Sequence, residues 1–184
     1  MKKRGKVRSV VMTTLSSVVV LVVALLLVWV FFLHKGGPLN YFLKPKSFEF
    51  NHKMEQADLY YFASEFATAT PMFEELVEMR PDNAIAHGKL GVSYAKTGKV
   101  EKALEHLDKA VELDPQFHEA FANKAAIHQS LARQKKELMD FPGAREQYLM
   151  AEMSIEKALE IKPKTSRYLE MQGEIVSEQR EMPE

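Results

Sequence analysis

Histidine is the residue type in this sequence that is best suited to metal binding or acid–base chemistry, because the chain has no cysteine. Its six histidines are His34, His52, His87, His106, His118 and His128. A zinc site on a helix needs two imidazoles three or four residues apart, so that both point from one face. No pair of these histidines has that spacing, so we expect no metal site. We interpret His87 and His128 as structural residues.

Other motifs that carry chemistry are also missing from the sequence. It has no glycine-rich phosphate loop, no nucleophile elbow and no motif of paired carboxylates. The charged residues between 101 and 112 include acid–base pairs four residues apart, such as Glu105 and Lys109, which is typical of a solvated helix face. We therefore expect no enzymatic activity and no cofactor.

The charges of the chain are unevenly distributed. The totals are balanced at 25 basic and 25 acidic residues, but the basic residues at positions 2, 3, 4, 6 and 8 precede every acidic one. The rest of the chain is mildly acidic, so nucleic acid is not an expected partner.

The sequence predicts a transmembrane helix at 10–33, after a basic tail at 1–9. The segment from Val10 to Leu33 has no charged residue, and residues 18–33 are all apolar. As a helix it extends about 36 Å, enough to cross a hydrocarbon core of about 30 Å. A cleaved signal peptide is the alternative. The apolar run is longer than the usual apolar core of such a peptide, however, and no cleavage site of small residues follows it. We expect this helix to anchor the protein in the lipid bilayer.

The flanking charges predict the orientation of this span. Because basic residues tend to stay in the cytoplasm, the N-terminus is expected there and the rest of the chain on the periplasmic or exoplasmic side of a single-pass protein. A linker at 34–50 follows, in which Gly36, Gly37 and Pro38 break the helix. Its aromatic residues, among them Phe48 and Phe50, either cover the end of the next domain or contact lipid headgroups or a membrane partner.

A pattern of small and apolar residues organises the chain after the linker. It consists of Leu90, Gly91, Tyr94, Gly98, Ala103, Leu107, Ala110 and Pro115. Gly91 and Ala103 permit the close approach of two helices, and the larger residues fill the space around that crossing. The pattern resembles a tetratricopeptide repeat. This resemblance implies an all-α solenoid of antiparallel helix pairs.

Shifting the pattern along the chain predicts the extent of the domain, 51–180. Repeats are expected at about 50–83, 84–117 and 118–165, with a capping helix at 166–180. In the third repeat the second-helix signature at Ala151 follows Ala103 by 48 residues instead of 34, which indicates a 14-residue insertion. The insertion is expected to lengthen both helices of this pair and to place Met139 and Phe141 at the tip of a projecting hairpin. These tip residues either pack between the arms or contact a partner.

In this family the first helix of each pair lines a concave surface that binds segments of partner proteins. The resemblance implies a partner-binding groove formed by Met54, Asp58, Tyr61, Ile85, Gly88, Val92, Lys96, Glu119, Ala122, Asn123, Ala126 and Gln129. Members that clamp acidic C-termini of chaperones use a Lys and an Asn on one helix and an Asn on the next. Of the corresponding Gly88, Val92 and Asn123, only Asn123 matches. This mismatch disfavours such a clamp. The groove, with its small and apolar residues, favours a helix or an extended apolar peptide, unless these residues only pack the inner helices.

The function expected from these features is that of a membrane-anchored protein–protein interaction scaffold. It would act as an assembly factor or an accessory subunit of a membrane or envelope complex, and its partners would be proteins of that complex. The alternative is a targeting or import receptor whose repeats face the cytosol. The two hypotheses differ in topology, and the charge distribution favours the first.

Overall fold

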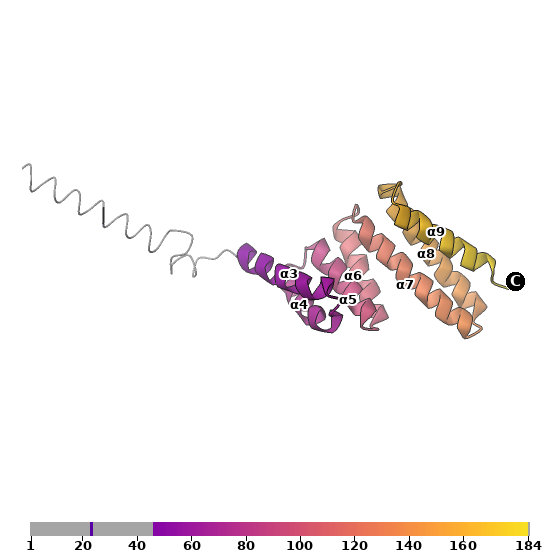
Figure 1. Cartoon of the computed structure of the whole chain (residues 1–184), viewed down its shortest axis with the longest axis horizontal. Helices are drawn as coiled ribbons and strands as arrows, with labels where there is room; N and C mark the ends of the chain where they lie inside the picture. Colours follow the sequence, from indigo (N-terminus) through magenta and orange to yellow (C-terminus); the bar gives the residue numbers. More distant parts are fainter. Residues whose placement is uncertain (1–22, 24–45, 184) are drawn as a thin grey trace, which may run out of the picture. The chain divides into compact units, whose positions relative to one another are not determined.

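A computed structural model of the chain describes Val23 and residues 46–183 (Figure 1). From Lys46 onward the chain forms the helices α3 (Lys46–Phe62), α4 (Phe66–Met79), α5 (Ala84–Lys96), α6 (Val100–Leu113), α7 (His118–Glu137), α8 (Phe141–Ile161) and α9 (Ser166–Arg180). Within these described ranges, no helix has both the length and the apolar character needed to cross a membrane. Apart from Val23, the predicted basic tail and transmembrane segment lie outside the described residues. The helices confirm the predicted all-α solenoid.

The helices are grouped in pairs by the lengths of their connections. Turns of three residues join α3 to α4, α5 to α6 and α7 to α8, and connections of four residues separate one pair from the next. Such short turns make the two helices of a pair antiparallel neighbours. Helix α7 contributes Ala120 and Ile127 to the apolar core of α3–α6, and Ala125 and Ala132 to the core that it shares with α8 and α9. The pairs are therefore stacked into one domain.

The crossing of α5 and α6 depends on a glycine. A methyl group on Gly91 would lie 2.7 Å from Cγ of Leu107 and 2.9 Å from the carbonyl oxygen of Ala103. Leu90 and Leu107 are fully buried beside this contact, and the Tyr94 hydroxyl donates a hydrogen bond to the Glu74 carboxylate on α4. The signature residues therefore form the core of the second pair, and Pro115 lies exposed in the turn after α6.

The first pair begins earlier than the sequence analysis predicts. Helix α3 starts at Lys46, inside the segment assigned to the linker, and Phe50 is buried in the core with the Arg80 guanidinium 4.3 Å from its ring centroid. Burial of Phe50 against the domain therefore extends the helix. Residues 34–45 of the predicted linker lie outside the described part of the chain.

The 14-residue insertion is divided equally between the two helices of the third pair. Helices α7 and α8 have 20 and 21 residues, whereas α5 and α6 have 13 and 14. Each arm is therefore about two turns, or roughly 10 Å, longer than its counterpart. The turn lies at 138–140, and the Asp140 side chain caps α8 by accepting a hydrogen bond from the Gly143 amide.

The tip of this hairpin differs from the prediction in one residue. Leu138 and Met139 are 80% and 79% exposed, and Met139 has a positive φ of 59°. Phe141 is instead the first residue of α8 and is half-buried, so it does not belong to the exposed tip. The cap formed by Asp140 therefore starts α8 at Phe141, the residue that was expected at the tip of the hairpin.

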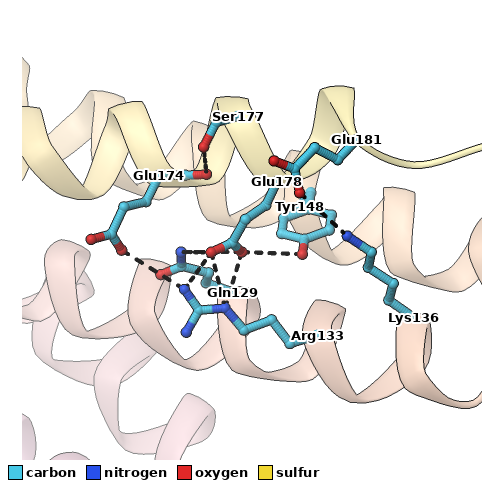
Figure 2. Close-up of polar contacts among 8 residues, drawn as sticks. All are labelled: Gln129, Arg133, Lys136, Tyr148, Glu174, Ser177, Glu178 and Glu181. Carbon is cyan, nitrogen blue, oxygen red and sulfur yellow. Dashed lines mark hydrogen bonds and ion pairs between the residues drawn. The ribbon is translucent and has the colours of Figure 1, made fainter.

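Helix α9 lies along the long hairpin and is held there by a half-buried carboxylate (Figure 2). The Glu178 carboxylate accepts hydrogen bonds from the guanidinium and Nε of Arg133, from Nε2 of Gln129 and from the Tyr148 hydroxyl at 3.1 Å. Ile175 is fully buried one turn earlier. Four side chains from three helices therefore converge at the point where α9 is attached.

The protonation states of this cluster follow from its contacts. Burial by itself raises the pKa of Glu178, but the hydrogen bond and charge of Arg133, with the bonds from Tyr148 and Gln129, outweigh it and leave the pKa lowered. Burial and the neighbouring Glu178 carboxylate raise the pKa of Tyr148 to about 12, so its hydroxyl remains a donor. The carboxylate is thus ionised when α9 is attached.

The first prediction concerns the glycine at the helix crossing. We expect Gly91→Ala to lower the free energy of unfolding by about 1–3 kcal/mol, because the new methyl group meets a backbone carbonyl that cannot move aside. The matched control is Gly173→Ala in α9, whose methyl group would have no neighbour within 4 Å and should stabilise the helix by about 0.5–1 kcal/mol. Urea unfolding measures both. Equal effects of the two substitutions would contradict the close crossing.

The second prediction concerns the carboxylate that holds α9. We expect Glu178→Gln to cost about 1–3 kcal/mol at neutral pH and to speed hydrogen exchange in α9, whereas Glu174→Gln, with its carboxylate 3.8 Å from Arg133, should cost less than about 0.5 kcal/mol. Because folding lowers the pKa of Glu178, its contribution is present above the unfolded value of about 4.5 and is lost as the pH falls through the folded value. The stability difference between wild type and Glu178→Gln should therefore shrink in acid. A pH-independent difference would contradict this role.

Candidate functional site

A groove of about 640 Å³ lies on the inner side of the helix stack. It is lined by residues from the end of α3, from the starts of α4 and α6, and from α5, α7 and α9. The first helices of all three pairs therefore contribute to one concave surface, and α9 closes its far side. A groove of this size accommodates a segment of a polypeptide.

The structure brings seven of the twelve predicted groove residues together. These are Tyr61, Val92, Lys96, Glu119, Ala122, Asn123 and Ala126. Small residues on α7, Ala122 and Ala126, leave space for a ligand, and Tyr61 and Val92 supply apolar surface opposite them. All seven lie on the first helix of a pair, which is what made them predictable.

The other five predicted residues do not line the groove. Gly88 is buried, and a methyl group there would lie 2.6 Å from Cε1 of Phe117, so this glycine admits an aromatic ring between two pairs. Gln129 is buried against α9, where it donates to Glu178.

The remaining three have other roles or positions. Met54 packs against the core, the Asp58 carboxylate pairs with the Lys89 ammonium at 2.5 Å, and Ile85 is half-exposed outside the groove. The contacts of Met54, Gly88 and Gln129 agree with the interpretation that these residues only pack or fasten the helices.

The groove also contains residues that the sequence analysis does not predict. Phe62 and Phe66 form an aromatic end beside Tyr61, whose ring packs edge-on against Phe66 with the centroids 5.6 Å apart. Arg167 and Tyr168 of α9 complete the opposite wall. The signal for Arg167 was present in the sequence, because it follows Glu119 by the same 48-residue interval that separates Ala151 from Ala103. Interpretation of α9 as a cap alone concealed it.

The charged groups of the groove are two cations and one anion. Lys96 and Arg167 line it together with Glu119, whose carboxylate lies 3.2 Å from Nδ1 of His118. Among the described residues, no carboxylate lies within ion-pair distance of Lys96 or Arg167. The groove is therefore apolar along its floor and positively charged in balance, a combination that suits a segment with both apolar and acidic side chains.

Charges from both walls of the groove affect the pKa of the Tyr61 hydroxyl. Burial raises the pKa of its hydroxyl first, and the neighbouring Asp58 carboxylate raises it further, while the positive charge of Arg167 acts in the opposite direction. Arg167 of α9 is thus close enough to affect a residue at the end of α3. The walls formed by the first and last helices of the domain face each other across the groove.

Four of the histidines that the structure describes, His87, His106, His118 and His128, make contacts inside the domain, whereas His52 is exposed. Nδ1 of His87 lies 2.9 Å from Nδ1 of His106, and Nδ1 of His128 lies 2.9 Å from Oε1 of Gln147. Burial lowers the pKa of both His87 and His106, so the neutral rings share a hydrogen bond between α5 and α6. Nδ1 of His118 approaches the Tyr168 hydroxyl at 2.9 Å and fastens the start of α9. These contacts support the interpretation of His87 and His128 as structural residues.

Comparison with known proteins identifies the repeats. The family model for the tetratricopeptide repeat matches residues 54–116. Human serine/threonine-protein phosphatase 5 is 28% identical over 86 residues, which make up 47% of this chain but only 17% of the phosphatase. The likeness therefore covers a small part of that protein.

Solved structures extend the likeness to the rest of the domain. The first TPR of Spaghetti (RPAP3), bound to the HSP90 peptide SRMEEVD, has a TM-score of 0.58 and 16% identity, and the match covers 70% of this chain and 91% of that one. The Arabidopsis OM64 TPR domain has a TM-score of 0.60 and 15% identity over 70% of this chain and 95% of that one. At these identities the likeness concerns the fold. Residues 54–116 thus match the tetratricopeptide-repeat family model, and the helical domain has the fold of the solved TPR domains.

Proposed function

We propose that this domain is a protein-binding module that holds an extended or helical segment of a partner in its groove. The observation that carries the proposal is the groove itself, in which an apolar floor lies beside two cations without an intramolecular counter-ion among the described residues. A ligand without apolar side chains or without an acidic group would leave the floor or the two cations unmatched, and its binding would be unfavourable. The partner segment therefore presents apolar side chains to Tyr61, Val92 and Phe66 and an acidic group to Lys96 and Arg167.

The peptide named in the RPAP3 structure has this kind of composition. It contains two glutamates and an aspartate beside methionine and valine. That peptide belongs to the other protein, and the groove of this chain has its own set of residues, with Arg167 on α9 as one cation. We therefore propose the chemical class of the ligand, an acidic and apolar peptide segment, and no particular chaperone.

The proposal includes a membrane anchor at 10–33. The uncharged apolar run and the preceding basic residues support a single-pass protein whose repeats lie on the periplasmic or exoplasmic side. In that position the groove would serve the assembly of a membrane or envelope complex, either transiently or as a permanent accessory subunit. A targeting receptor is the second candidate, and it requires the repeats to face the cytosol.

The third prediction tests the groove. Peptides selected by the full-length protein from a random library displayed on phage should be enriched in acidic and apolar residues. Ala126→Trp, which fills the floor, and Arg167→Glu, which reverses a cation, should each weaken binding at least about tenfold. Arg180→Glu, on the same helix but outside the groove, is the matched control and should bind as wild type does. Unchanged binding by Ala126→Trp would place the ligand elsewhere.

The fourth prediction tests the anchor and its orientation. The chain has no cysteine, so single cysteines introduced as Lys2→Cys and Glu170→Cys report their location in sealed vesicles. A membrane-impermeant maleimide added outside right-side-out vesicles should label position 170 and not position 2, and alkaline carbonate should leave the protein in the membrane. The reverse labelling would support the receptor, and release by carbonate would exclude the transmembrane span.

A further inference from the structure

The outer face of α8 carries a stripe of exposed apolar side chains. Leu149, Met150 and Met153 are 50%, 41% and 55% exposed. Their spacing of one, three and four residues places them on one face of the helix, opposite the buried residues Tyr148 and Ile155. The stripe thus points away from the core.

No part of the domain covers this stripe. Among the described helices, α7 and α9 pack on the buried side of α8, where Tyr148, Ala151 and Ile155 have no exposed surface. Two methionines in such a stripe provide an adaptable apolar surface, which is typical of a docking site. The side chains at its two ends indicate what docks there.

Charged residues bracket the stripe in an order that is its own complement. Arg145 and Glu146 precede it, and Glu156 and Lys157 follow it, so the signs on either side of the stripe are positive and negative before it, and negative and positive after it. All four side chains are exposed. Glu152 lies between Met150 and Met153 in sequence, but it is half-buried and about 110° around the helix from the middle of the stripe. When this order is reversed, as on a helix that runs in the opposite direction, each positive charge lies opposite a negative one.

The angular positions of these residues on the helix agree with that pairing. At about 100° per residue, Arg145 and Glu156 lie on one flank of the stripe, within about 20° of each other. Glu146 and Lys157 have the same separation but lie in line with the stripe, between the directions of Met153 and Met150. In an antiparallel pair, equivalent flanks of the two helices meet. Arg145 then faces Glu156, and Glu146 faces Lys157, while Met150 faces Met153. The arrangement is isologous, so each contact occurs twice about a two-fold axis.

We propose that the outer face of α8 is a homodimerisation surface, occupied by α8 of a second copy running antiparallel, with the two-fold axis beside residue 151. Four intermolecular ion pairs flank a centre of leucine and methionine side chains. The dimer lies outside the groove and goes beyond the peptide-binding function proposed above. Since three apolar side chains per copy bury less than the roughly 800 Å² per partner of a standard interface, the dimer is reversible.

The spacing of the charges distinguishes ion pairs between two copies from ion pairs within one chain. Glu146 and Lys157 are 11 residues apart in α8, about 16 Å along the helix axis, so they cannot form an ion pair within one copy. Within its own chain, Lys157 instead pairs with Glu160 at 2.7 Å, and Arg145 donates to the carbonyl oxygen of Pro183. Any coupling between positions 146 and 157 therefore reports a second copy.

The fifth prediction uses charge reversal and its rescue in the full-length protein in detergent. Sedimentation velocity over a concentration series should show a monomer–dimer equilibrium for wild type. Glu146→Lys and Lys157→Glu should each raise the dissociation constant at least about tenfold, because like charges then face each other twice. The double substitution Glu146→Lys with Lys157→Glu should restore it to within about threefold of wild type. Glu170→Lys, on the exposed side of α9, is the control for charge reversal and should dimerise as wild type does.

A second measurement does not depend on affinity. Mixed Met150→Cys and Met153→Cys proteins should form a disulfide between the two variants faster than either variant forms one with itself, because these positions face each other across the axis. Helical circular dichroism confirms that the exposed substitutions leave the fold intact. A monomer at all concentrations, a double reversal no better than the single ones, or capture of the stripe by a different protein in place of a second copy would overturn the proposal.

Discussion

The attachment of α9 to the long hairpin is the interaction on which the inner surface of the domain depends. One half-buried carboxylate, Glu178, holds the helix through Arg133, Gln129 and Tyr148, with Ile175 packed beside it. The start of the same helix then places Arg167 and Tyr168 in the groove. A helix that would otherwise only close the end of the stack thus becomes a wall of the binding site. Because the attachment combines this polar cluster with buried apolar residues of α9, its strength depends on charge as well as on burial.

The insertion in the third pair supplies part of this attachment. Arg133 lies on the turns that lengthen α7, whereas Gln129 and Tyr148 lie in the parts of α7 and α8 that correspond to α5 and α6. The exposed apolar side chains of α8 lie in that corresponding part too, after its added turns. The inner side of the hairpin completes the groove, and its outer side carries the stripe with self-complementary charges. Peptide binding and dimerisation can proceed together because they use opposite faces of one element.

The proposed activities fit a protein held at a membrane. The proposed anchor would confine two copies to the surface of one bilayer, which would raise their effective concentration and favour a weak dimer. Each copy keeps its groove on the concave side, so a dimer presents two grooves to its partners. Such an arrangement suits the assembly of a complex that contains repeated subunits or more than one exposed segment.

The sequence by itself determined the helix pairs, their boundaries to within a few residues and the residues at their crossings. Small residues such as Gly91 and Ala103 recur at fixed intervals because only they let two helices approach closely, and that requirement is local enough to be read from spacing. The composition of the groove could be partly predicted for the same reason, since Val92 and Ala126 occupy equivalent positions 34 residues apart in successive repeats. Only the tertiary structure decided which of these positions remain open. Gly88 and Gln129 are filled or covered by Phe117 and Glu178, which come from other pairs, and Arg167 reaches the groove because the superhelix brings the last helix opposite the first. Contacts between residues so far apart in the chain depend on the rotation of each pair relative to the next, a quantity that no local pattern of residue types specifies.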